Sequence, residues 1–328
     1  MIALIACALV AGAALVVRSD RVRALLMLVA LVAAPVILVV HIRDSEQLHT
    51  LRDHPALAVV AGLLAAAALA LLALLFARRP QALPLAVALT IPFRIPIAVA
   101  GSTSNLLLPL YLVVAAGALA WALPRLRRIG EASRPPGALE WTLAAALVLY
   151  AIQGAYGSGH DRALENLVFF YVPFALLFVL LSRLSWTKQM LARTLAVLAG
   201  IAVVLAGIGY VEYATRHVLL NPKVIASNQL EDYFRVNSLF FDPNIYGRFL
   251  AVVLVLLVAW MLWELRTRGV ALGAVLCAFL FGGLVLTLSQ SSFAALLAGL
   301  AVLAALRWSV RWTLAASALA IVAAVLAV

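Results

Sequence analysis

The chain has 328 residues, of which 66% are hydrophobic, and its mean hydropathy is +1.13. Soluble domains are roughly half apolar, so this composition excludes an ordinary soluble protein. The formal net charge of +11 raises nucleic acid as a partner, but the distribution of the charges favours another explanation.

Apolar runs recur along the whole chain at about 17–25 residues, the length that a helix needs to cross a bilayer. We therefore predict an all-α, polytopic integral membrane protein with about twelve transmembrane helices in a single domain, 1–328. The predicted spans are 1–17, 24–42, 56–76, 82–99, 105–123, 138–156, 164–181, 191–213, 244–264, 270–288, 292–306 and 312–328.

Basic residues alternate between successive connections. Sixteen of the 24 Lys and Arg residues lie in the odd-numbered connections, and six lie in the even-numbered ones. Cytoplasmic connections are the ones enriched in Lys and Arg, so we expect the odd connections inside and both termini outside. The basicity then reflects topology and contact with anionic lipid, and no nucleic-acid partner is expected.

The first span and the cysteines bear on processing and redox chemistry. Residues 1–17 lack a basic leader and a second span follows at once, so a cleaved signal peptide is not expected. Cys7 and Cys277 both fall in apolar runs, which predicts two buried thiols and no disulfide. No Cys/His cluster has metal-ligand spacing, so we expect neither a metal nor a cofactor.

The fourth predicted span contains an arginine between two prolines, in the segment Ile91-Pro92-Phe93-Arg94-Ile95-Pro96. Prolines remove backbone donors and break a helix. Broken helices at membrane depth are tolerated where they line a cavity or are buried in protein. Arg94 is therefore either a partner for the freed carbonyls or a cation lining a polar cavity on the outer side.

The connection 214–243 is about thirty residues long, and loops of that length are commonly functional or disordered. It ends in Asp242-Pro243-Asn244, where Asp242 is expected as a helix N-cap and Pro243 as the first helical residue. Such an N-terminus also attracts anions. Arg248 follows about one turn inside the membrane, where it either snorkels to the head groups or belongs to a site.

Further polar groups flank the same face. Arg235 either pairs with Glu231 or Asp232 or serves a site. The hairpin 287–292 offers Ser291 and Ser292 at the N-terminus of the eleventh span, as caps or as anion contacts. Candidate general bases are Glu212, His217 and Asp242, but no spacing fixes a partner for any of them, so the catalytic residue is unknown. Glu212 has the favourable i,i+4 spacing to pair with Arg216.

Arg94, Arg235 and Arg248 are predicted to converge on the outer side. The planar fork of arginine binds two phosphate oxygens at once. We therefore predict a site for a diphosphate attached to a long lipid, formed by these three arginines. The residues expected to support it are Asp242, Asn244, Ser289, Gln290 and Ser291.

The segment R-V-N-S-L-F-F-D-P-N-I-Y-G-R-F-L-A resembles a signature of the O-antigen ligase and polysaccharide polymerase superfamily. There, an arginine precedes a short apolar run and an (Asn/Asp)-Pro-Asn before a transmembrane helix. The segment L-T-L-S-Q-S-S-F-A-A-L-L-A-G resembles the second signature, and P-F-R-I-P-I followed by L-L-P-L-Y resembles the N-terminal half. The resemblance covers roughly residues 82–306.

The resemblance implies metal-independent transfer of a glycan from undecaprenyl diphosphate to an acceptor hydroxyl, at the outer face of the bacterial cytoplasmic membrane. Arg235 matches the loop arginine of the family, whereas Gln290 stands where the family usually has a second arginine. The family's candidate catalytic histidine follows the equivalent of the last span here, so the chain is expected to be an N-terminal portion.

Two alternatives to this glycan ligase or polymerase remain at the sequence level. A transporter or flippase of lipid-linked glycans would need polar residues along a path to the inner leaflet. Once the ends of the spans are set aside, however, the interruptions are Arg94 and Arg248, both in the outer half. A structural membrane scaffold would leave Arg94 and the long loop unexplained.

Overall fold

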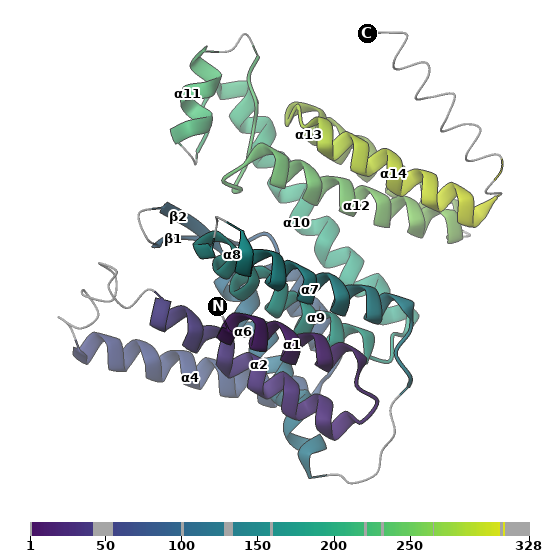
Figure 1. Ribbon diagram of the computed structural model, residues 1–328. Helices are drawn as coiled ribbons and strands as arrows, with labels where there is room; N and C mark the ends of the chain where they lie inside the picture. Colours follow the sequence, from purple (N-terminus) through teal and green to yellow (C-terminus); the bar gives the residue numbers. More distant parts are fainter. Residues whose placement is uncertain are drawn as a thin grey trace. The chain divides into compact units, whose positions relative to one another are not determined.

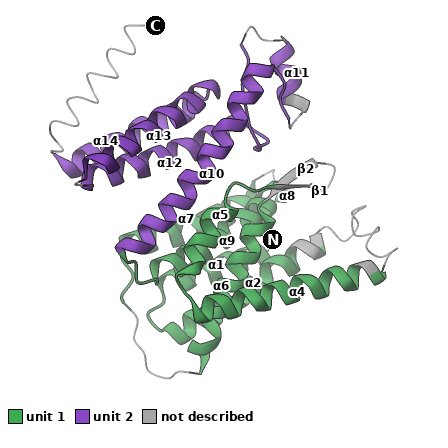
Figure 2. Cartoon of the chain, turned by 180° about the vertical axis from the view of Figure 1, so that it is seen from behind, with its two compact units in different colours: residues 1–187 green, residues 188–328 purple. Residues whose placement is uncertain are grey.

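The computed structural model describes residues 2–41, 55–99, 102–127, 134–157, 160–219, 222–230, 233–264, 266–308 and 311. These residues belong to two compact units, Met1–Thr187 and Lys188–Val328, which Figure 2 distinguishes by colour. Helices form almost all of both units (Figure 1), as the composition predicts for an all-α protein.

Unit 1 contains most of the helices and one short hairpin. Its elements are α1 (Ile2–Val16), α2 (Asp20–His41), α4 (Pro55–Arg78), α5 (Ala82–Thr90), β1 (Ile95–Val99), β2 (Ser102–Leu106), α6 (Leu108–Leu126), α7 (Ala138–Tyr156), α8 (His160–Asn166), the π-helical turn η1 (Leu167–Tyr171) and α9 (Val172–Ser182). The helix α1 packs on α2 and α7, while α6 packs on α2, α4 and α9.

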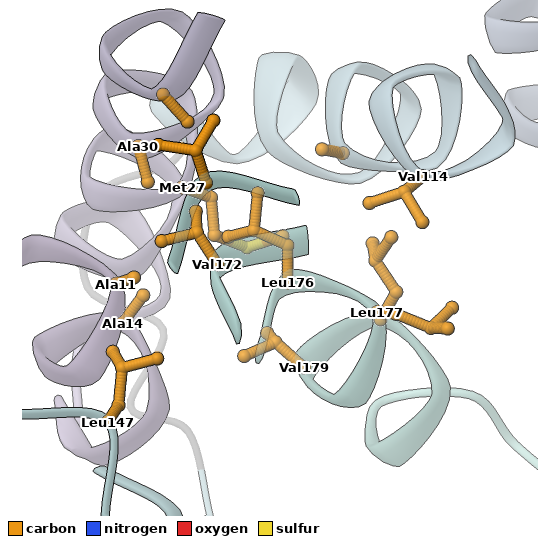
Figure 3. Close-up of a cluster of buried hydrophobic side chains, with 14 of the residues drawn as sticks. Ala11, Ala14, Met27, Ala30, Val114, Leu147, Val172, Leu176, Leu177 and Val179 are labelled. Carbon is orange, nitrogen blue, oxygen red and sulfur yellow. The ribbon is translucent and has the colours of Figure 1, made fainter. Parts of the chain in front are cut away.

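The core of unit 1 is built from small residues facing large ones. Figure 3 shows Ala11 and Ala14 of α1 and Met27 and Ala30 of α2 within a buried cluster that also takes in side chains of α6, α7 and α9. Small side chains allow helices to approach closely where lipid supplies no hydrophobic drive between them. The alanine-rich sequence of α1 and α2 is therefore a packing surface.

A buried arginine joins the first two helices. Arg23 is fully buried in α2, and its Nε donates to the carbonyl of Ala14 at 3.0 Å. The same guanidinium donates to the carbonyl of Val17 and pairs with Asp20. Helix C-termini leave carbonyls without helical partners, so Arg23 satisfies the end of α1 from within α2.

The predicted span 82–99 was wrong. The helix α5 stops at Thr90, and β1 pairs antiparallel with β2 in the register Ile95 to Leu106. The amide of Ile91 still donates to Val87 at 3.0 Å, but Pro92 has no amide with which to continue the ladder. The two prolines thus end the helix instead of bending a continuous span.

Every regular element in the described residues of unit 2 is a helix. Its elements are α10 (Lys188–Thr215), α11 (Pro222–Leu230), α12 (Pro243–Trp263), α13 (Thr267–Leu286) and α14 (Gln290–Arg307). The helix α12 packs on α10, α13 and α14, and α10 also packs on α13. The predicted loop 214–243 thus contains a helix of its own, α11.

Glycines set the closest helix contacts of unit 2. A Cβ on Gly247 of α12 would lie 2.6 Å from the Ser292 hydroxyl of α14, and one on Gly299 would lie 2.5 Å from Val255. The spacing between α12 and α14 therefore requires glycine at both points, as in other membrane helix pairs that pack through small residues.

The described residues include eight helical segments that are long and apolar enough to cross a membrane: Ala58–Arg78, Leu108–Leu126, Ala138–Tyr156, Arg162–Ser182, Lys188–Thr215, Pro243–Trp263, Thr267–Leu286 and Gln290–Arg307. The chain is a multi-pass membrane protein, but this number does not support the predicted twelve. The helix α1 is shorter, α5 is interrupted, and the predicted span 312–328 lies outside the described residues. The single-domain assignment stays a prediction.

Candidate functional site

The polar segment that leads into α12 is folded around a buried carboxylate. Glu212, near the end of α10, is 1% exposed. Its two oxygens accept the backbone N–H groups of Leu219 at 3.1 Å, Asn237 at 3.2 Å and Ser238 at 2.8 Å. Both oxygens of a carboxylate are acceptors, so Glu212 links the segment to α10 through these hydrogen bonds.

The same segment is also held by a hydrogen bond from a residue with a left-handed backbone and by aromatic packing. Ser238 has φ of 50°, in the left-handed region, and its hydroxyl donates to the carbonyl of Leu205 at 2.8 Å. Phe240 stacks on Tyr246 with ring centroids 5.6 Å apart and also meets Phe249. A left-handed residue other than glycine persists where the surrounding contacts hold it in place, and the contacts of Ser238 and Phe240 do so here.

Arg235 joins three elements of unit 2. Its backbone N–H donates to Asn228 Oδ1 of α11 at 3.0 Å, and its carbonyl accepts from Asn228 Nδ2 at 2.9 Å. The side chain donates from Nε to the Thr287 carbonyl at 3.0 Å and from one terminal nitrogen to Asn244 Oδ1 at 3.1 Å. The fork of Arg235 is thereby fixed between α12 and the turn before α14.

A hollow of about 370 Å³ opens beside this arginine, lined by Tyr233, Arg235, Leu288, Gln290 and Phe293. Arg235 uses two of its five N–H groups on protein acceptors, so its fork keeps donors for a ligand. The hollow therefore brings together Arg235 and Gln290, which lie 55 positions apart in the sequence. It combines a held cation with an amide and aromatic side chains.

The start of α12 matches its predicted cap. Asp242 is the N-cap, and its carboxylate accepts the Asn244 N–H at 2.6 Å, while Pro243 opens the helix. Asn244 and Arg248 are spaced i,i+4, which places them on one face of the helix about one turn apart. Arg248 is exposed, so this face carries a cation one turn beyond Asn244, the residue that the Arg235 side chain contacts.

The turn before α14 has a different cap from the one predicted. Ser289 is the N-cap and is 1% exposed, but its hydroxyl meets the hydroxyls of Ser292 at 2.8 Å and Ser291 at 3.3 Å instead of a backbone amide. The Ser292 hydroxyl also donates to the Asn244 carbonyl at 3.3 Å. The serines thus join α14 to α12 at the residues that flank Gln290.

Arg94 is half-buried and belongs to unit 1, between α5 and β1. Arg235 and Arg248 belong to unit 2. The convergence of Arg94 with the other two arginines therefore stays a prediction. The partners considered for Arg235, Glu231 and Asp232, lie outside the described residues.

The three candidate bases have different surroundings. The carboxylate of Glu212 accepts hydrogen bonds from three backbone amides, and that of Asp242 accepts one as the N-cap of α12. His217 is exposed and lines a second hollow of about 350 Å³. The predicted pair of Glu212 with Arg216 was wrong, because Arg216 stacks over the Tyr213 ring at 4.4 Å instead. Within the residues that the structure describes, no group of three His, Cys, Asp or Glu side chains could hold a metal ion.

Sequence reasoning missed the roles of Glu212, Asn228 and the Thr287 carbonyl. A main-chain carbonyl leaves no mark in a sequence, and Asn228 looks like any loop amide. Glu212 did carry a signal: it is an acidic residue in an apolar run, and such residues are paired inside membranes. Its partners are backbone amides, which composition does not display.

Comparisons of the chain with protein-family models, with curated proteins and with solved structures find no match.

Proposed function

We propose that the protein is a membrane glycosyltransferase of the ligase or polymerase kind, which moves a glycan from undecaprenyl diphosphate to an acceptor hydroxyl. One observation carries the proposal: the Arg235 fork is held by Thr287 and Asn244 beside a hollow that also contains Gln290. A preorganised cation of this type suits a diphosphate leaving group.

In the proposed reaction, the acceptor oxygen attacks the anomeric carbon of the lipid-linked sugar. The bond from that carbon to the diphosphate oxygen breaks, and undecaprenyl diphosphate leaves with the bonding electrons. Arg235 stabilises the charge that develops on the diphosphate, and Arg248 lies one helical turn beyond Asn244, the residue that Arg235 contacts. The acceptor hydroxyl loses its proton to a base.

The side of the membrane is part of the same proposal. The Lys and Arg distribution supports odd connections in the cytoplasm, so the Arg235 site faces outward at the cytoplasmic membrane. Arg94 as a third diphosphate contact, and a full complement of about twelve spans, also belong to the proposal. The site needs no metal in this scheme, because the arginines supply the positive charge.

The test is binding of undecaprenyl diphosphate to the full chain in nanodiscs of zwitterionic lipid. Losing a hydrogen bond to a charged group costs about 1.5–3 kcal/mol, so Arg235→Ala should weaken binding by roughly 10- to 150-fold. The matched control is Arg268→Ala, an exposed arginine in the first turn of α13, which should leave the affinity unchanged.

Because Arg235 also holds Thr287 and Asn244, a second variant separates binding from folding. Gln290 is exposed and lines the hollow, so Gln290→Arg adds a cation without removing a described contact. We expect it to bind undecaprenyl diphosphate about tenfold more tightly. Unchanged affinity in both Arg235→Ala and Gln290→Arg would overturn the proposed site.

A further inference from the structure

Arg216 occupies a backbone position that normally belongs to glycine. It follows α10 with φ of 53°, and the next amide, that of His217, donates to the Glu212 carbonyl at 3.2 Å. This six-to-one bond around a left-handed residue is the Schellman motif, in which glycine is usual because a Cβ is strained there. A large side chain is therefore kept at a position that disfavours it.

The Arg216 side chain is positioned by two aromatic rings. Its guanidinium carbon lies 4.4 Å from the Tyr213 ring centroid and 5.3 Å from that of Phe234. Stacking uses the flat face of a guanidinium and leaves its N–H edge able to bind in the plane. Backbone strain that the surroundings hold in place often marks a functional position.

This arginine lines the second hollow of unit 2. The hollow measures about 350 Å³, within the range of small-molecule sites, and its lining includes Arg216, His217, Asn228, Gln229, Tyr233 and Phe234. The lining thus offers amide, imidazole and phenol groups, which complement sugar hydroxyls as donors and acceptors. Its aromatic rings offer flat apolar surface for the faces of a sugar ring.

The two hollows are neighbours. Tyr233 lines both of them, and Asn228 lines the second while it binds the main chain of Arg235 through two hydrogen bonds. A ligand with its diphosphate beside Arg235 therefore has its next chemical group, the first sugar, within reach of the second hollow.

We infer that the hollow beside Arg216 binds the first sugars of the lipid-linked glycan, and that Arg216 favours sugars bearing a carboxylate. The inference rests on the proposed function for the position of the diphosphate. It adds a substrate class, acidic glycans, because Arg216 brings a full positive charge to a lining otherwise suited to any sugar.

The test uses soluble probes, so that it does not depend on the lipid. A trisaccharide of galacturonic acid and a neutral galactose trisaccharide are titrated into the full chain in nanodiscs of zwitterionic lipid. We expect the acidic probe to bind about tenfold more tightly. Arg216→Gly should reduce this preference to about one, while Arg216→Lys should keep part of it.

Arg216→Gly is informative because glycine suits the left-handed position, so the variant is expected to fold with an unchanged unfolding temperature. Equal affinity for the two probes in the unaltered chain, or a preference that survives in Arg216→Gly, would overturn the inference.

The two proposals fail separately. Arg235→Ala should weaken binding of undecaprenyl diphosphate and leave the affinity for the free trisaccharides unchanged. Arg216→Gly should weaken binding of the acidic trisaccharide and leave the affinity for undecaprenyl diphosphate unchanged. A loss of diphosphate binding in Arg235→Ala without any trisaccharide binding would support the proposed function and reject the sugar subsite.

Discussion

Replacing Glu212 with alanine is the most direct test of how the site is held. The change deprives three backbone amides of their acceptor, and two of them belong to Asn237 and Ser238, which are fully buried. An unsatisfied buried donor costs about 1–3 kcal/mol. The two buried amides alone therefore predict a loss of about 2–6 kcal/mol in the free energy that keeps residues 236–240 folded.

Hydrogen exchange measured by mass spectrometry reports this loss locally. Each 1.36 kcal/mol is tenfold in a rate or equilibrium, so the segment 236–240 should exchange about 30-fold faster or more in Glu212→Ala. Exchange in the middle of α12 should be unaffected, because those amides are bonded within the helix.

Two further variants sharpen the result. Glu212→Gln keeps one oxygen that can still accept from Asn237 and Ser238, so its effect should be intermediate. Glu264→Ala is the matched control, since that carboxylate accepts a single amide, from Arg266 at 2.9 Å, at an exposed position. An exchange rate in Glu212→Ala within threefold of the unaltered chain would refute the argument that this carboxylate holds the segment.

Two other predictions concern packing and buried charge. Gly247→Ala should lower the free energy of unfolding by about 1–3 kcal/mol, because its Cβ would meet Ser292 at 2.6 Å, whereas Gly200→Ala, with nothing within 4 Å, should change it by less than about 1 kcal/mol. Chemical denaturation in mild detergent measures both, and equal effects would contradict the glycine argument. Arg23→Met should cost about 3–5 kcal/mol because Asp20 and two carbonyls lose their partner. Exposed Arg21→Met should cost less than about 0.5 kcal/mol, and a similar melting temperature for the two variants would count against the buried role.

The fold class and most span positions could be predicted from the sequence because hydrophobic length is a local property. The segments near 105–123, 191–213 and 244–264 all contain the predicted helices. The span 82–99 could not be assigned from hydropathy, since Pro92 acts through a missing hydrogen bond and leaves the apolar average high. Arg23 lies between the predicted spans 1–17 and 24–42, yet it is buried, because its partners are the carbonyls at the end of α1.

The sequence predicted which residues belong to the candidate site better than it predicted the contacts that hold them. Asp242 as N-cap follows from local chemistry, and the structure confirms it. Gln290 was predicted as a supporting residue of the arginine site, and in the structure it lines the same hollow as Arg235. The function of both stays a prediction. Nothing in the sequence marks Arg216, because its left-handed backbone conformation can be recognised only from the φ angle in the structure.

The bond from Arg235 to the Thr287 carbonyl spans 52 residues of sequence, which has a consequence for biosynthesis. Ribosomes add about 5–20 residues per second, so the carbonyl is made roughly 3–10 s after the arginine. During that interval the guanidinium lacks one of the two acceptors that orient it. The site is therefore completed late, when the turn before α14 has been synthesised, and a nascent chain that ends before this turn has an Arg235 without its final orientation.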